Sequence, residues 1–467
     1  MIYDNTSKNI NESDAFTKHL GMFTHPKGAH LTERTKLLGD WLQQRMDVGT
    51  WNYSRVLEKS PAPITGVKNS YGDVIEKINF GSQDYLGLAS HPSIRDAAVR
   101  ALNEYGPHSA SSAILQGNTG ISRQLEQSIA DLMQMEHVLL FPTGWAAGFG
   151  TIAGLVRPND YVVLDRHAHA CLMQGARAAT DKHTFFRHND VADCRRKLEK
   201  IRAKDTTNAI LVVSEGIFSM DSDSPDVLKL QELCHEFNAV LLLDVAHDLG
   251  ALGPNGTGQP GLQNMLGKID LVMGAFSKTF SSNGGFLATH NLSVKQYISI
   301  YGGSYTFSNA LSPVQTGVVD EAIRIARSEE GDRLRKKLFD NIYRLRAGFS
   351  AAGLECLGEP SPIVPVSVGD EKLAKWTSRA LEQNGLIANL VEYPAVARGR
   401  ARFRFQVMAS HSTRQIDSAI QIFCRSLEEA RASYAVNEAK SETGGSGFGV
   451  DLLNRIRAEQ PSILQPV

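Results

Sequence analysis

A lysine stands where an apolar stretch gives way to a polar loop that contains two glycines. Residues 271–275 (LVMGA) are continuously apolar and predict a buried strand, and Lys278 follows shortly after it. An amine at the end of such a strand is partly desolvated, which lowers its pKa and suits it to form a Schiff base with a flat aldehyde cofactor. Taken alone, a lysine in this position is more often a solvated surface charge.

A second polar pair follows another apolar run. Residues 240–243 (VLLL) are typical of a strand buried on both faces of a parallel sheet, and Asp244 and His247 come directly after it. An acid at the carboxyl end of such a strand can keep a pyridine nitrogen protonated, as pyridoxal phosphate (PLP) requires to act as an electron sink. Alone, Asp244 could be a helix cap and His247 a partly buried histidine. Together with Lys278 they predict a PLP site.

Short apolar runs alternate with helical patterns from about residue 138 to residue 289. Runs at 138–141, 161–165, 210–215, 240–244 and 271–275 predict the strands of a largely parallel sheet with helices on both faces. Ligands of such sheets bind beyond the carboxyl ends of the strands. We therefore expect one cluster of residues at that edge: Thr143, Asp165, Glu215, Asp244 and Ser277.

The remaining segments predict a second domain and two terminal extensions. We expect an N-terminal arm with a helix and a hairpin (1–75), a large PLP-binding domain (76–315) and a smaller C-terminal α+β domain (316–439). The hairpin should turn at residues 71–73, and the first 30 residues, which are polar, should be loosely held. A long charged helical pattern opens the small domain, and a Gly/Ser-rich tail (440–467) is expected to be disordered.

Bulk composition limits the class of protein. The chain has 467 residues, 42% of them hydrophobic, which is enough for a large core and two domains. A formal net charge of −1 gives no basic surface for nucleic acid. No run approaches the ~20 apolar residues of a transmembrane segment, and the polar N-terminus lacks a secretory signal. Five dispersed cysteines without a CxxC pair indicate a cytoplasmic protein, without a disulfide framework or a zinc site.

Several ordered motifs resemble one enzyme family. The run from Asp244 to His247, followed by Ser277 and Lys278, resembles the α-oxoamine synthases, a branch of the fold-type I PLP enzymes. The resemblance extends from about Asn79 to Ile416, which is most of the chain. It implies an α/β fold, with a mostly parallel central sheet in a large domain and a smaller C-terminal α+β domain.

The resemblance assigns roles around the cofactor. Lys278 would carry PLP and later act as the base at the α-carbon, and Asp244 would hold the ring nitrogen. His169 would stack on the ring, with Cys171 in place of the usual serine, and His247 would orient the ring hydroxyl. Further residues are implied at or near the cofactor, most of them at its phosphate: Gly144 and Trp145 at a helix N-terminus, Ser219, Ser277, and Ser308 with Asn309 from the neighbouring subunit.

Two arginines alternate on a predicted strand, so that they face the same side. By motif position Arg404 would bind the substrate carboxylate, whereas Arg402 is interpreted as a structural ion pair. The chain departs from the family pattern at residues 111–113 (Ser-Ser-Ala), where the family has Gly-Ser-Arg. It also departs at Ala275, where a threonine is common.

The resemblance implies decarboxylative condensation of a small amino acid with an acyl thioester, which gives an α-amino ketone, CO2 and free thiol. It also implies a homodimer with shared active sites. The sequence leaves open the amino acid, the acyl group, and whether the donor is acyl-CoA or an acyl carrier protein. An aminotransferase or lyase on the same fold stays an alternative. So does a non-catalytic subunit, which would need the lysine to be lost.

Overall fold

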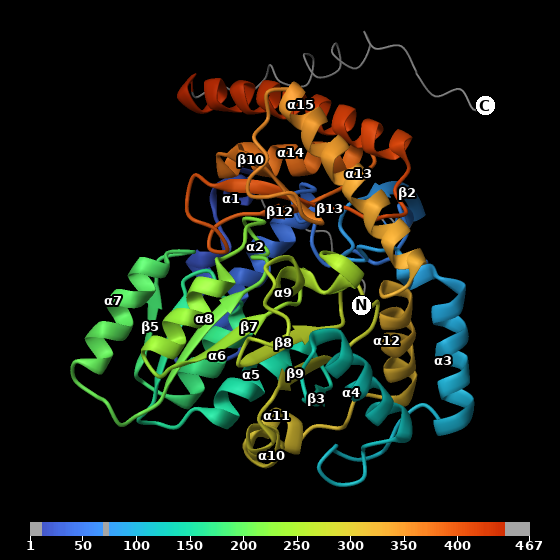
Figure 1. The fold of residues 1–467 in the computed structure, drawn as a ribbon. Coiled ribbons are helices and arrows are strands. Elements are labelled where there is room, and N and C mark those ends of the chain that lie inside the picture. Colours follow the sequence, from blue (N-terminus) through green and yellow to red (C-terminus); the bar gives the residue numbers. More distant parts are fainter. Residues whose placement is uncertain (1–11, 69–73, 444–467) are drawn as a thin grey trace.

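The computed structural model describes residues 12–68 and 74–443. Its central feature is a seven-stranded sheet in the order β3-β9-β8-β7-β6-β4-β5, in which only β9 runs antiparallel to its neighbours (Figure 1). The strands are β3 (His137–Phe141), β4 (Tyr161–Asp165), β5 (His183–Phe186), β6 (Ile210–Glu215), β7 (Val240–Asp244), β8 (Leu271–Ala275) and β9 (Gly285–Thr289). The predicted α/β fold is confirmed, and each predicted strand is present.

Helices cover both faces of this sheet. The helices of this part of the chain, of which α3 packs against α12, are α3 (Pro92–Tyr105), α4 (Gly120–Met133), α5 (Gly144–Leu155), α6 (Ala170–Ala179), α7 (Val191–Arg202), α8 (Val227–Glu236), α9 (Gly258–Leu262), α10 (Leu292–Tyr301), α11 (Gly303–Thr306) and α12 (Pro313–Ala326). Successive strand residues face opposite ways. Val162 and Leu164 therefore pack in the cluster of α5 and α6, whereas Val163 packs in the cluster of α4, α7 and α8.

A smaller antiparallel sheet, in the order β10-β13-β12, follows in the chain. It consists of β10 (Ile363–Gly369), β12 (Asn389–Val391) and β13 (Ala401–Gln406), and it packs with α13 (Glu329–Ala351), α14 (Glu371–Gln383) and α15 (Thr413–Thr443). The long charged helical pattern predicted before this sheet forms two helices, α12 and α13, rather than one. The chain breaks between them because the Ser328 side chain accepts a hydrogen bond from the Gly331 N–H and caps the start of α13. Helix α15 continues past residue 440, and 444–467 lie outside the described residues.

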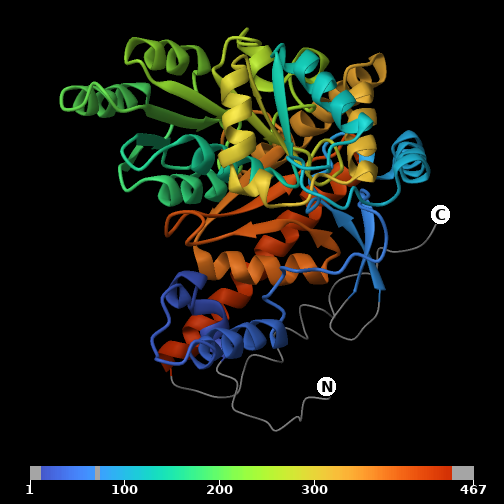
Figure 2. The same cartoon turned by 90° about the horizontal axis from the view of Figure 1, so that it is seen from below.

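The N-terminal segment packs on the small sheet's helices. It contains α1 (Glu12–Thr17), α2 (Lys36–Asp47) and the hairpin of β1 (Ile64–Lys68) and β2 (Val74–Asn79), which β11 (Leu386–Ile387) extends (Figure 2). The predicted turn at 71–73 lies outside the described residues. The expectation that the first 30 residues are loose is wrong for α1, because Phe16 is buried and stacks on Trp376 at 4.1 Å between ring centroids.

No helix in residues 12–68 and 74–443 combines the length and apolarity that crossing a bilayer requires.

A buried ion cluster holds the N-terminal segment in place. The two oxygens of Glu392 lie 3.0 Å from an Arg45 amino group and 3.2 Å from the Lys375 amine, and all three side chains are at most 2% exposed. The Lys375 amine also donates to the backbone carbonyls of Phe16 and Lys18. Burial lowers the pKa of Lys375, and Glu392 opposes this shift. The single carboxylate therefore serves two cations from distant parts of the chain.

Replacing Glu392 with glutamine should lower the free energy of unfolding by about 3–5 kcal/mol, because Arg45 and Lys375 would remain buried without a counter-charge. The urea midpoint, followed by tryptophan fluorescence, measures this. Asp340→Asn is the control, since it breaks an exposed pair with Lys336 and should leave the midpoint almost unchanged. A Glu392→Gln midpoint equal to that of the wild type would contradict the prediction.

Candidate active site

A cavity of about 200 Å³ lies beyond the carboxyl ends of β6, β7 and β8, where α5 and α6 begin. Nine of the residues predicted at this edge or at the cofactor line it: Thr143, Gly144, Trp145, His169, Glu215, Asp244, His247, Ser277 and Lys278. Asp165, which was predicted in the same cluster, does not line it. A larger cavity of about 560 Å³, between residues 252–262 and α13, contains none of the predicted residues. The smaller cavity is therefore the candidate active site.

Lys278 and Asp244 face this cavity, where Asp244 is buried and Lys278 is half-buried. Burial lowers the pKa of the Lys278 amine, while Asp244 and Glu215 oppose that shift. Burial raises the pKa of Asp244, and Lys278 opposes it in turn. Within the described residues no hydrogen bond or ion pair engages the Lys278 amine, whereas the carboxylate of Asp244 accepts only the N–H of Ala246, at 2.9 Å. Both groups are free to bind a ligand.

The geometry around His169 fixes which ring nitrogen carries its proton. The backbone N–H of Cys171 lies 3.3 Å from Nδ1 and can only donate, so Nδ1 accepts. The Cys171 thiol is 3.0 Å from the same nitrogen. Desolvation lowers the pKa of His169 although Asp244 opposes it, so the ring is neutral near pH 7. A neutral ring whose Nδ1 accepts carries its proton on Nε2.

Two further cavity residues have contacts that the sequence did not predict. His247 is buried, and its Nδ1 lies 2.9 Å from the Tyr85 hydroxyl. Glu215 stands beside Asp244 in the register of β6 and β7 and accepts the backbone N–H of His169. Burial, and then Asp244, raise the pKa of Glu215. Both residues lie in motifs noticed in the sequence, but only the fold reveals their partners.

Asp248, the residue after His247, lies next to this group. It is fully buried, accepts the Gln259 N–H at 2.6 Å, and has one carboxylate oxygen without a partner among the described residues. Burial raises the pKa of Asp248 to about 7.

The first turn of α5 forms one wall of the cavity. Thr143 caps this helix by accepting the Ala146 N–H at 3.0 Å, and the amides of Gly144 and Trp145 begin the helix, where no preceding helical carbonyl can pair with them. Such an N-terminus binds anions. A Cβ on Gly144 would collide with the side chain of Ala275, so glycine is needed for α5 to reach the end of β8.

The two arginines of β13 both contact the loop that follows β6. Arg402 pairs with Asp221 and donates to the Met220 carbonyl, which confirms the predicted ion pair. Arg404 donates from an amino group to the Ser219 carbonyl at 3.1 Å, and its Nε is buried without a partner among the described residues. Neither Ser219 nor Arg404 lines the 200 Å³ cavity.

Ser308 and Asn309 do not reach their own chain's cavity either. Asn309 is exposed and pairs with Ser112 in an antiparallel bridge, and the Ala310 N–H donates to the Ser111 carbonyl. The 111–113 stretch that departs from the family pattern therefore packs against the segment assigned to the neighbouring subunit.

The residues present fit PLP. Lys278 offers an unengaged amine of lowered pKa, Asp244 an acidic group in the same cavity, and the start of α5 a site for the phosphate. Asn283, from the same loop as Lys278, also lines the cavity. Its side-chain amide supplies a hydrogen-bond donor, whereas Ala275 lacks the hydroxyl of the threonine that is common at its position.

Comparison with known proteins agrees with this chemistry. Residues 75–423 match the family model of class I and II aminotransferases. The chain is 31% identical over 382 residues to an 8-amino-7-oxononanoate synthase of Thermoanaerobacter pseudethanolicus, covering 82% of this chain and 94% of that protein. It is 33% identical over 351 residues to a serine palmitoyltransferase of Sphingobacterium spiritivorum, covering 75% and 86%.

Solved structures give the same result. The serine palmitoyltransferase of S. paucimobilis, with bound PLP and myriocin, superposes with a TM-score of 0.80 at 27% identity, over 86% of this chain and all of that one. The enzyme of Sphingomonas wittichii gives 0.80 at 26%, with the same coverage. The chain therefore belongs to the class I and II aminotransferase family of PLP-dependent enzymes, in its α-oxoamine synthase branch.

Proposed function

We propose that this protein condenses a small amino acid with an acyl thioester, giving an α-amino ketone, CO2 and free thiol. The observation that carries the proposal is that Lys278, Asp244 and His169 line one cavity. The chain's family membership agrees with this chemistry. PLP, when bound, supplies the electron sink for the α-carbon. The chain's own residues supply the proton transfers and the orientation.

Each residue acts through the property that the fold gives it. The Lys278 amine, with its lowered pKa, takes the proton from the α-carbon. The Asp244 carboxylate holds a proton on the ring nitrogen of the cofactor. Because Nε2 of His169 carries the proton, this ring donates a hydrogen bond to a substrate oxygen, either of the carboxylate or of the thioester carbonyl. Arg404 offers its guanidinium to the substrate carboxylate.

Thiol release from a matrix of amino acids and acyl thioesters, with mass spectrometry of the ketone, tests the proposal. At least one pair should release thiol and ketone in equal amounts, and Lys278→Ala should abolish both. CoA and carrier-protein thioesters belong in the same matrix, because the acyl donor is not assigned. Formation of a keto acid without thiol release would instead indicate an aminotransferase.

We also propose a cytoplasmic homodimer with shared active sites, divided into domains at 76–315 and 316–439. All five cysteines are unpaired, which suits the cytoplasm. Phe307 and Leu115, close to Ser308 and to the 111–113 stretch, are 88% and 75% exposed, as expected of residues that a second copy covers.

Replacing the two arginines one at a time should separate their roles. Arg404→Ala should raise the amino-acid KM by about tenfold or more, because a charged hydrogen bond to the carboxylate is lost. Arg402→Ala should mainly lower the unfolding midpoint, because Asp221 loses its ion pair. Steady-state kinetics and urea unfolding of both variants measure this. The opposite pattern would mean that the wrong arginine has been assigned to the substrate.

Two inactive variants should restore activity when they are refolded together. One carries Lys278→Ala, and the other carries both Ser308→Ala and Asn309→Ala. In a mixed dimer one site collects every defect, while the other takes Lys278 from one chain and residues 308–309 from its partner and is wholly wild type. Each variant refolded alone is the control. If mixed dimers form, as shown by a tag on one variant, and no activity returns, the shared-site arrangement is wrong.

A further inference from the structure

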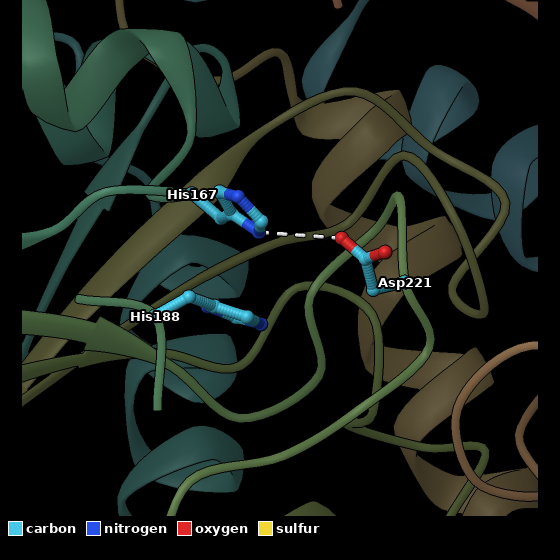
Figure 3. A group of neighbouring side chains, drawn as sticks. All are labelled: His167, His188 and Asp221. Carbon is cyan, nitrogen blue, oxygen red and sulfur yellow. Dashed lines mark ion pairs between the residues drawn. The ribbon is translucent and has the colours of Figure 1, made fainter. Parts of the chain in front are cut away.

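Two imidazole rings stack beside the candidate active site. His167 and His188 lie 4.1 Å apart between ring centroids, with 27° between their planes (Figure 3). The Nδ1 of His188 is 2.8 Å from an oxygen of Asp165, and its Nε2 is 2.9 Å from an oxygen of Asp223. A ring that faces a carboxylate oxygen from each nitrogen donates from both, so His188 is an imidazolium.

The positive charge of His188 persists through the neutral pH range. Burial lowers the pKa of His188, but the hydrogen bonds to Asp165 and Asp223 outweigh burial and raise the pKa to about 10. Asp165 is fully buried at the end of β4, where it also accepts the backbone N–H groups of His167 and Asn189. His188 is thus fixed to the large sheet by one carboxylate and to the loop after β6 by the other.

The second ring holds the same loop at another point. Nδ1 of His167 lies 3.2 Å from Asp221 (Figure 3), and Asp221 also pairs with Arg402 of β13. The hydrogen bond from His167, followed by that from Arg402, holds the pKa of Asp221 well below its usual range. Asp221 is therefore shared between the large sheet and the small sheet.

The loop of residues 219–223 also contacts Arg404, the arginine proposed to bind the substrate carboxylate. In residues 219–223 the imidazoles bind Asp221 and Asp223 from one side, while Arg402 and Arg404 reach the loop from β13. Arg404 makes its contact at the Ser219 carbonyl.

The same side chains could be considered for a metal ion. One ligand atom each of His167, His188 and Asp221 lie within 4.8 Å of one another. However, nearly parallel stacked rings direct their nitrogen lone pairs side by side rather than toward one point. Both nitrogens of His188 are also already donating to carboxylates. The geometry is that of a hydrogen-bonded ion network.

We propose that His167 and His188 form a two-imidazole clamp that positions the loop 219–223, and through Ser219 the guanidinium of Arg404, to bind the amino-acid carboxylate. Both histidines are positioning residues, since neither lines the cavity. His167 is also two residues from His169. One short segment therefore positions both the imidazole proposed to stack on the cofactor and the loop that contacts Arg404. The inference rests on the proposed function for the role of Arg404.

The test compares His188→Gln with His183→Gln in the PLP-loaded enzyme. His183 is a matched control because it lies on β5 and binds only the Thr180 carbonyl, away from the loop. Amino-acid binding is measured by titrating the cofactor absorbance, and KM and kcat are measured for both substrates. His188→Gln should raise the amino-acid Kd and KM by about tenfold, as loss of a charged hydrogen bond does, with kcat and the thioester KM near wild type. His183→Gln should change none of these.

Asp223→Asn, which keeps the shape of the loop side chain but removes its charge, should repeat the effect and decides the matter if His188→Gln does not fold. A wild-type amino-acid Kd in Asp223→Asn or in a folded His188→Gln overturns the proposal. So does one equivalent of zinc that the wild type binds and His167→Ala does not, because that result would mean a metal site. If no substrate pair releases thiol, the proposed function fails. The titration still measures the amino-acid Kd of each variant, and so still tests the clamp.

Discussion

The site depends on placing ionisable groups of opposite charge where water is largely excluded. Asp244 ends β7 and Lys278 lies in the loop just after β8, and each shifts the other's pKa against the effect of burial. In a medium of low polarity such groups are stable only when they are paired or bound to a ligand. The parallel register of β6, β7 and β8 brings them together, and it also places Glu215 beside Asp244 as a second carboxyl whose pKa burial raises.

Much of this could be predicted because the signals are local. Each predicted strand is a run of apolar residues, and each predicted cavity residue follows such a run or begins the next helix. Asp244 and Lys278 were therefore noticed from the apolar runs that precede them, and they predicted a site only when taken together and compared with the family pattern. The same locality explains why the central sheet was easier to predict than the small one, whose strand β12 has only three residues.

Features that depend on distant partners could not be predicted. Tyr85 meets His247 across 162 positions of sequence, and the two histidines of the clamp meet their carboxylates only after three segments have converged. His167 is exposed, and its immediate neighbours in the sequence do not indicate that it pairs with Asp221. The break before α13 depends on one serine cap inside a continuous helical pattern. Phe16 could not be assigned to a core, because its partner Trp376 lies far along the chain.

The cluster of Arg45, Glu392 and Lys375 has a consequence for biosynthesis. Arg45 and Glu392 are 347 positions apart, and the backbone of Phe16 and the amine of Lys375 are 359 apart. At roughly 5–20 residues per second, the N-terminal helices leave the ribosome tens of seconds before their counter-charge is made. During that interval Phe16, which is buried in the folded protein, lacks Trp376, the ring on which it stacks. The N-terminal segment is thus made well before the residues that fix it, and its contacts with Lys375 and Glu392 can form only after these two residues have been translated.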